Sequence, residues 1–236
     1  MITGKPRNTS QFVSELEAFY STDYYDGVYF DIYRFKQFLI DFENQLLKTN
    51  KNIIKELEKE EPDITISMMR EPHIDNTLNR FPEILKKNSY ITVYAYLEAK
   101  LFELIKLIEK HFPKKMTFKD YIKSVPRTKS KVVMMLKYFE DILKLTFDSK
   151  KEIDKFENYR FIRECIVHCN SDISISKDKN KIDQIIKKTS ELSSNDNIIQ
   201  INDNSYILQL AELTNELFKK LIQIASIELN NITPST

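Results

Sequence analysis

The chain has 236 residues, of which 42% are hydrophobic and 30% are charged, and its formal net charge is +1. This length and apolar content suffice for one substantial core, so we expect a single compact unit. The longest apolar runs, such as residues 132–136, are far shorter than the roughly 20 residues of a membrane span. The first residues, MITGKPRNTSQF, also lack the apolar core of a secretory signal. We therefore expect a cytoplasmic protein without a membrane partner.

Glycine and cysteine are both scarce, with Gly4, Gly27, Cys165 and Cys169 as their full set. Loops that cradle phosphates need glycine where backbone amides approach a ligand closely, so the composition excludes P-loop and dinucleotide-binding chemistry. The two cysteines are too few and too close together for a disulfide framework, which agrees with a reducing compartment. A chain this poor in glycine favours helices joined by polar loops.

The N-terminal segment is acidic and rich in tyrosine. Residues 10–31 contain five acidic residues and neither Lys nor Arg. Because tyrosine is enriched in protein interfaces, its cluster here either forms a surface for a partner or covers the bundle. In a further interpretation, the segment is an acidic arm that masks a basic cleft elsewhere in the chain. The cluster comprises Tyr20, Tyr24, Tyr25, Tyr29 and Tyr33.

Five stretches carry apolar residues at helical spacing, and prolines fall between the earlier ones, where a helix would be interrupted. Five stripes with a period near 3.6 predict an all-α fold, a helical bundle of about five main helices. We divide the chain into an N-terminal helical region, residues 1–80, which either packs on the core or is regulatory, and a helical domain, residues 81–232. The stripes lie in residues 35–46, 94–108, 132–143, 153–169 and 210–224.

A basic segment precedes and enters the third stripe. Residues 114–137 contain eight basic residues against one acidic residue, Asp120. Positive charge near the start of a helix opposes the helix dipole, which hints at another purpose. Arg127, Lys129 and Lys131 could contact the phosphates of an RNA backbone, although a solvated face explains most charge runs.

Two segments lie between the fourth and fifth stripes, the first polar and the second with short β-prone runs. Residues 171–197 are polar, and one short helix is expected around residues 182–188. Residues 198–208 read IIQI-NDN-SYIL, two β-prone runs around a polar turn. This pattern predicts a small β-hairpin, or else a lead into the last helix.

One histidine stands out among the three in the chain. His73 lies in a segment punctuated by prolines, and His111 closes an expected helix, where its charge suits the helix dipole. His168 follows Arg163 by five residues and ends an apolar helix at the polar sequence Cys-Asn-Ser-Asp. Such a pair suits cleavage of an RNA phosphodiester by its own 2′-hydroxyl, because His can transfer protons and Arg can hold the charged phosphate. A metal is not required for this chemistry.

The spacing of Arg163 and His168 decides whether one helix can direct both side chains to the same site. At about 100° per residue, positions five apart point roughly 140° away from each other, so one helix is expected to present the pair poorly. If two protomers pack through this helix about a two-fold axis, each Arg and His acquires a symmetry mate. Two pairs would then line one cleft, and dimerisation would complete the site.

With this motif, Arg163-Glu-Cys-Ile-Val-His168, the sequence resembles the HEPN superfamily. Ribonuclease members of that family carry an Arg, four to six variable residues and a His near the end of a helix. Two further features are similar: an earlier helix with the lead Tyr94-Ala-Tyr-Leu-Glu98-Ala, and a final amphipathic helix after a polar, strand-like insert. The resemblance covers roughly residues 84–230.

The resemblance implies an all-α homodimer that cleaves RNA without a cofactor at a composite interface site. It also implies a role in toxin–antitoxin, abortive-infection or other antiviral systems, with an antitoxin or defence-system protein as a further partner. Arg163 would bind the phosphate and His168 would transfer protons. Glu164 departs from the Asn, Asp or His that is common after the Arg. The candidate catalytic residues are Arg163, Glu164 and His168, and the candidate RNA-binding residues are Arg127, Lys129, Lys131 and Arg160.

Two alternatives stay open at this point. Some members of the superfamily are catalytically inactive, so the chain could instead be a protein-binding, RNA-binding or dimerisation module, with the charge of Glu164 part of the reason. Cys165, His168 and Cys169 share a helix face and could ligate a metal, but a structural zinc usually has a fourth ligand. We expect packing cysteines and no metal.

Overall fold

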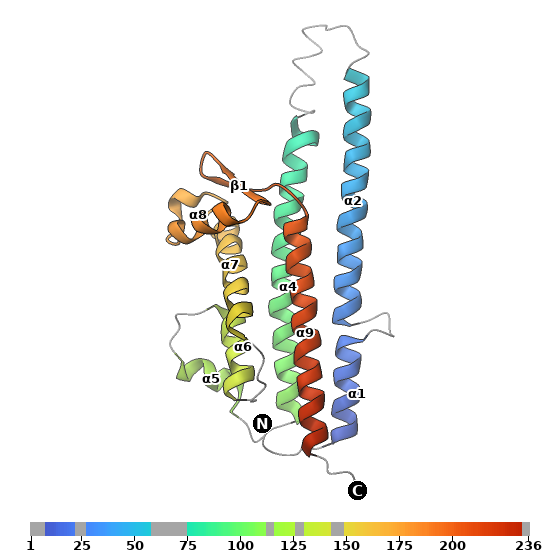
Figure 1. The fold of residues 1–236 in the computed structure, drawn as a ribbon, viewed down its shortest axis with the longest axis vertical. Helices are drawn as coiled ribbons and strands as arrows, with labels where there is room; N and C mark the ends of the chain where they lie inside the picture. The colour runs from blue at the N-terminus through green and yellow to red at the C-terminus, as the bar shows by residue number, and fades with distance from the viewer. Residues whose placement is uncertain are drawn as a thin grey trace.

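Long helices that run nearly the length of the molecule dominate the fold (Figure 1). The computed structural model describes residues 8–21, 27–57, 75–111, 116–125, 130–142 and 149–232. The helices are α1 (Thr9–Tyr20), α2 (Val28–Leu57), α4 (Phe81–His111), α5 (Phe118–Ser124), α6 (Lys131–Asp141), α7 (Ser149–His168), α8 (Lys179–Lys188) and α9 (Ser205–Ile232), with a π-helical turn, η1 (Asn76–Arg80), and a 3-10 turn, η2 (Ile173–Ile175). The strands are β1 (Leu192–Asn195) and β2 (Ile198–Ile201).

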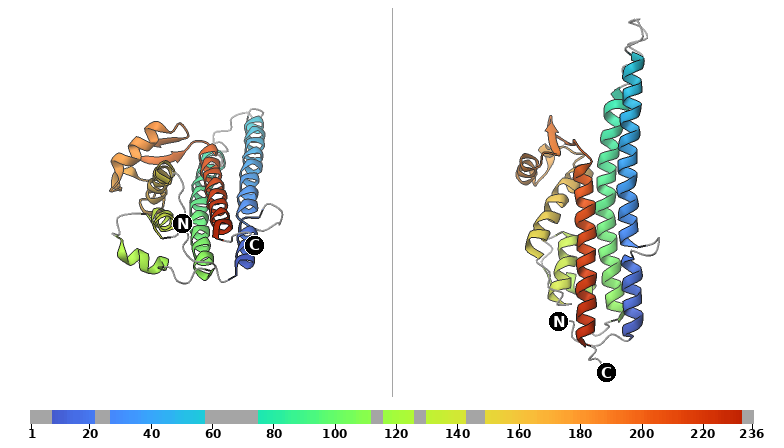
Figure 2. Two further views of the ribbon diagram at one scale, coloured as in Figure 1. Left: turned by 60° about the horizontal axis from the view of Figure 1, so that its bottom comes forward. Right: turned by 45° about the vertical axis from the view of Figure 1, so that its right-hand side comes forward.

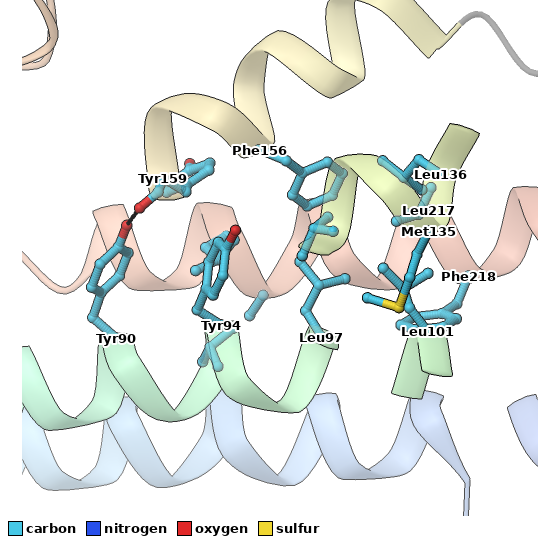
Figure 3. Packing of buried hydrophobic residues seen from close by; sticks show 14 of the residues in the cluster. Tyr90, Tyr94, Leu97, Leu101, Met135, Leu136, Phe156, Tyr159, Leu217 and Phe218 are labelled. Atoms are coloured by element: carbon cyan, nitrogen blue, oxygen red, sulfur yellow. Dashed lines mark hydrogen bonds between the residues drawn. The ribbon is translucent and has the colours of Figure 1, made fainter. Parts of the chain in front are cut away.

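The central pair, α4 and α9, lies between two flanks (Figures 1 and 2). On one flank α1 and α2 follow one another along the bundle, and on the other flank α6 and α7 pack on α4. α7 runs antiparallel to α4, because Tyr159 lies over Tyr90 while Phe156 lies over Leu97 (Figure 3). The end of α7 therefore lies near the start of α4, where β2 also contacts α4.

A stripe along α4 forms the middle of the core. Its side chains are almost completely buried and meet large side chains from α6, α7 and α9 (Figure 3). Burying one such leucine stabilises the fold by about 1.5–3 kcal/mol relative to leaving it exposed. The expectation of an all-α bundle is confirmed, and the five stripes correspond to α2, α4, α6, α7 and α9. The buried residues of the α4 stripe are Tyr90, Val93, Tyr94, Leu97, Leu101, Leu104, Ile105 and Ile108.

Helix α1 lies in the region expected to be helical, but it carries none of the five predicted stripes. Asn8 caps this helix, because its side-chain oxygen accepts a hydrogen bond from the backbone nitrogen of Gln11 at 3.1 Å. Phe12 and Leu16, one turn apart, are buried in the same core as α4 and α9. The described part of the N-terminal region thus packs on the main helices.

The small hairpin exists, but its turn lies earlier in the chain than predicted. β1 pairs antiparallel with β2 around Asp196 and Asn197, whose φ angles of 50° and 65° suit a tight hairpin turn. The expected turn at residues 202–204 instead starts α9, where the Asp203 carboxylate accepts a hydrogen bond from the backbone nitrogen of Ser205. The run SYIL therefore leads into the last helix. The short helix expected around residues 182–188 is the second half of α8.

None of the helices in the described ranges combines the length and the apolar character that crossing a bilayer would require.

Candidate active site

The end of α7 is fixed by backbone hydrogen bonds. The carbonyl of Cys165 accepts from the backbone nitrogens of both Cys169 and Ser171, each at 3.0 Å. Asn170 and Ser171 have φ angles of 49° and 67°, a left-handed conformation that reverses the chain after the helix. The polar break predicted after His168 is confirmed, and this histidine is the last residue of α7.

Arg163 and His168 lie together at this helix end. The Nη1 atom of Arg163 is 3.4 Å from Nε2 of His168, whose side chain is exposed. The expectation that a single helix presents the pair poorly is wrong. Side chains on a helix lean toward its N-terminus, so the imidazole of His168 leans toward the turn that carries Arg163. The arginine side chain is long enough to span the remaining angular separation. Because an arginine nitrogen always donates, the contact fits the tautomer in which Nε2 accepts and Nδ1 carries the proton.

Part of the Arg163 side chain enters the core beside Tyr94. Its Nε atom and the Tyr94 hydroxyl are both buried and have no hydrogen-bond partner within the part of the chain that the structure describes. Figure 3 shows the Tyr94 hydroxyl pointing toward α7. Burial raises the pKa of Tyr94 above its ordinary value, and the nearby charges of Glu98 and Glu157 raise it further, whereas Arg160 and Arg163 act in the opposite direction. The phenol therefore stays protonated.

Arg160 is engaged by two acidic side chains of its own helix. Its guanidinium contacts Glu157 at 2.9 Å and Glu164 at 2.7 Å. Burial opposes its charge, but these two ion pairs hold the pKa of Arg160 above its ordinary value. The guanidinium of Arg160 is thus paired with Glu157 and Glu164, and RNA contact by Arg160 stays a prediction.

The loop after α7 forms a wall opposite the helix end. The Asp172 carboxylate accepts hydrogen bonds from the Ser174 backbone and hydroxyl, which starts the turn η2 and lowers the pKa of Asp172. The hairpin turn holds this loop, because the backbone nitrogen of Ile173 donates to the carbonyl of Asn197 at 2.8 Å. The loop is thus attached to the hairpin.

A pocket of about 300 Å³ lies between this wall and α7. It combines polar and apolar side chains next to His168. The sequence did not predict the pocket residues that follow α7, because a contact between distant segments, Ile173 and Asn197, places them opposite the helix. The lining residues are Phe161, Glu164, His168, Cys169, Ile175, Ser176, Lys177 and Asp178.

Of the three residues of the basic segment that were predicted to contact RNA, the structure describes Lys131. Lys131 begins α6, and its ammonium lies 5.5 Å from the centre of the Phe102 ring on α4. Arg127 and Lys129 lie outside the described residues, as does His73. RNA contact by this segment stays a prediction.

The cysteines pack beside the site. Cys165 is buried, and burial, followed by the neighbouring Cys169, raises its pKa to about 12. A thiol in this state is a poor metal ligand, because metals bind the thiolate. In the described ranges, no group of three or more His, Cys, Asp or Glu side chains converges as metal ligands would.

The acidic N-terminal segment lies on the bundle. α1 packs on α4 and α9, and the Tyr20 hydroxyl donates to Asn215 on α9 at 3.1 Å. These described residues lie on the flank of the bundle opposite α6 and α7 (Figure 1), and masking of a basic cleft stays a prediction. Tyr33 is 49% exposed, whereas Tyr24 and Tyr25 lie outside the described residues.

Comparison of the chain with protein-family models, with curated proteins and with solved structures gave no match.

Proposed function

We propose that this protein is a metal-independent endoribonuclease of the HEPN type that cleaves RNA by attack of a 2′-hydroxyl on the adjacent phosphodiester. One observation carries the proposal: Arg163 and the exposed His168 lie 3.4 Å apart beside a pocket at a well-anchored helix end. An arginine that binds phosphate and a histidine with an accepting nitrogen are the two groups that this reaction needs.

The reaction moves two protons. The 2′-oxygen attacks phosphorus while a base takes its proton, and the bond to the 5′-oxygen breaks while an acid protonates that oxygen. The products are a 2′,3′-cyclic phosphate and a 5′-hydroxyl. One chain supplies His168 for one transfer. We infer a homodimer in which His168 of the partner subunit performs the other, with both Arg163 side chains on the phosphate.

The decisive test is cleavage of labelled RNA in the presence of EDTA. Wild-type protein should give products that end in 2′,3′-cyclic phosphate, and His168→Ala and Arg163→Ala should not. Lys187→Ala and Arg80→Ala remove exposed side chains of similar charge away from the site and should cleave like the wild type. If no protein cleaves any of several structured and single-stranded RNAs, the proposed activity is refuted.

One observation favours the alternative of an inactive binding module. The Nη1 atom of Arg163 lies 3.4 Å from Nε2 of His168 and engages the nitrogen that the proposed proton transfer uses. In an active enzyme, RNA phosphate must draw the guanidinium away from the imidazole. In the inactive module, RNA would bind without cleavage, and Arg163→Ala would weaken binding while His168→Ala would have little effect.

The resemblance to HEPN proteins supports a role in antiviral defence or in a toxin–antitoxin pair. Expression of the wild type in bacteria should then arrest growth, and His168→Ala at equal protein level should not. Growth arrest by both proteins would contradict a nuclease toxin.

A further inference from the structure

The pocket beside His168 is lined by charged groups of both signs. Glu164 and Asp178 contribute carboxylates, Ser176 contributes a hydroxyl and Lys177 contributes an ammonium. Each carboxylate also has a cation nearby, Arg160 at 2.7 Å from Glu164 and Lys181 at 3.6 Å from Asp178. The carboxylates suit a ligand whose edge carries N–H groups. Phe161 and Ile175 add apolar surface, and Ile175 is 67% exposed although it is a large apolar side chain. A flat ring with N–H donors on its edge would place its edge against the carboxylates and its face against the apolar side chains.

The size of the pocket limits its occupant. A volume of about 300 Å³ lies at the lower end of the range for small-molecule sites. It therefore suits one ring system. Single-stranded RNA offers such a ring, because unstacked bases are read on their hydrogen-bonding edges.

Glu164 is held in place for this task. Arg160 lies one turn before Glu164, and His168 lies one turn after it, so the three share a face of α7. Arg160 donates to Glu164 Oε2 at 2.7 Å and is itself held by Glu157. A base on Glu164 would thus lie one helical turn from the histidine that acts on the phosphodiester. The same ion pair offsets the negative charge that Glu164 would otherwise present to the phosphate.

We propose that this pocket binds a guanine base at the cleaved bond, with Glu164 as the specificity residue and Arg160 as a positioning residue. The inference rests on the proposed ribonuclease function. Guanine presents two adjacent donors, N1–H and the N2 amino group, which one carboxylate can accept together. Adenine and cytosine place an acceptor nitrogen beside their amino group, and uracil places its N–H between two carbonyls. Each of these bases would bring an acceptor against the carboxylate.

The first experiment measures which bonds the full-length protein cleaves. Wild type should cleave next to guanosine at least about tenfold faster than next to the other nucleosides. Inosine lacks the N2 amino group, so replacing that guanosine with inosine should remove most of the preference. Glu164→Gln offers one acceptor and one donor, and should lower the rate of cleavage next to guanosine to the rate next to the other nucleosides.

Two further variants separate positioning from folding. Arg160→Ala should reduce the ratio of guanosine to adenosine cleavage, and Arg160→Lys should restore part of it, since a charge again faces Glu164. Glu157→Gln removes the other ion pair of Arg160 but keeps the one to Glu164, so it should reduce the ratio less than Arg160→Ala does. Cleavage without a guanosine preference, or an equal preference in Glu164→Gln, would overturn the inference and leave the ribonuclease function intact.

The second experiment tests the pocket without catalysis. His168→Ala protein is titrated with the four nucleoside 3′-monophosphates in a calorimeter, and Glu164→Gln in the same background is the control. Guanosine 3′-monophosphate should bind at least about tenfold more tightly than the other three, and the control should lose this difference. If all four bind equally or not at all, the inference fails, even if RNA is cleaved. If RNA is not cleaved but guanosine 3′-monophosphate binds selectively, the ribonuclease proposal alone fails.

Discussion

The Nε2 atom of His111, buried at the end of α4, lies 3.1 Å from Oε2 of Glu15 on α1. Lys110 adds a second contact, because its ammonium lies 2.8 Å from both oxygens of the same carboxylate. The Phe12 ring lies 4.8 Å from the imidazole, measured between ring centres. Glu15 thus attaches the first helix to the end of the central one.

This attachment predicts a dependence of stability on pH. The hydrogen bonds from Lys110 and then from His111 lower the pKa of Glu15 from 4.5 to about 2 in the folded protein. Because the folded pKa is below the unfolded one, the contact stabilises the fold above about pH 4.5 and is lost as the pH falls toward 2. Thermal unfolding followed by circular dichroism should show wild type melting above Glu15→Gln at pH 6. That difference should shrink as the pH approaches 2, and a constant difference would refute the argument.

Arg163 should matter more for the reaction than for folding. Arg163→Ala removes the group assigned to the phosphate and should lower kcat/KM for RNA cleavage by about 100-fold to 1000-fold. Arg163→Lys keeps the charge but loses the paired donors, so it should recover a part of the loss. Melting temperatures of both variants provide the control. A variant that is stable and fully active would remove Arg163 from the site.

Mixing of subunits tests whether both histidines are needed. Wild type and His168→Ala are unfolded together, refolded at varied ratios and assayed on RNA. If each dimer needs two intact histidines, activity should follow the square of the wild-type fraction, so an equal mixture should retain about one quarter of the wild-type activity. Linear dependence would show that one chain suffices. Light scattering on the same samples should give the mass of a dimer.

The buried tyrosines should tolerate little change. The Tyr90 hydroxyl donates to the backbone carbonyl of Tyr159 on α7, and its ring lies 5.4 Å from that of Tyr206 on α9 (Figure 3). Tyr90→Phe removes this donor inside the core and should reduce the free energy of unfolding by about 1–3 kcal/mol. Urea denaturation measures the change. Tyr33→Phe, at a half-exposed position of α2, should change it by less than about 0.5 kcal/mol.

The pattern of apolar and polar residues along the chain was enough to predict the two helices that carry the site. The apolar stripe from Tyr94 to Ile108 is a property of one helix, and the end of α7 after His168 follows from the polar residues that succeed it. The ion pairs of Arg160 could also have been read from the sequence, since Glu157 and Glu164 lie three residues before it and four after it. That spacing places both carboxylates on the face of α7 that carries Arg160.

The residues that line the pocket opposite α7 could not be predicted from local sequence patterns. Ile175 and Asp178 face α7 because Ile173 bonds to the turn at Asn197, and no local pattern records such a pairing. The hairpin register had a signal that was missed. Asp196 and Asn197 are residue types that tolerate positive φ, so their position just before the β-prone run Ile198–Ile201 marks the turn better than the segment after residue 201.

The bond between Ile173 and Asn197 joins the two ends of an excursion that contains α8. Because this bond closes the excursion at its base, the part beyond Asp178 can gain or lose residues without moving Ile175 and Asp178, which line the pocket. α7, by contrast, is packed on several sides and admits little change. Insertions and deletions should therefore accumulate in α8 and in the loop before β1, while Arg163 and His168 stay where the bundle holds them.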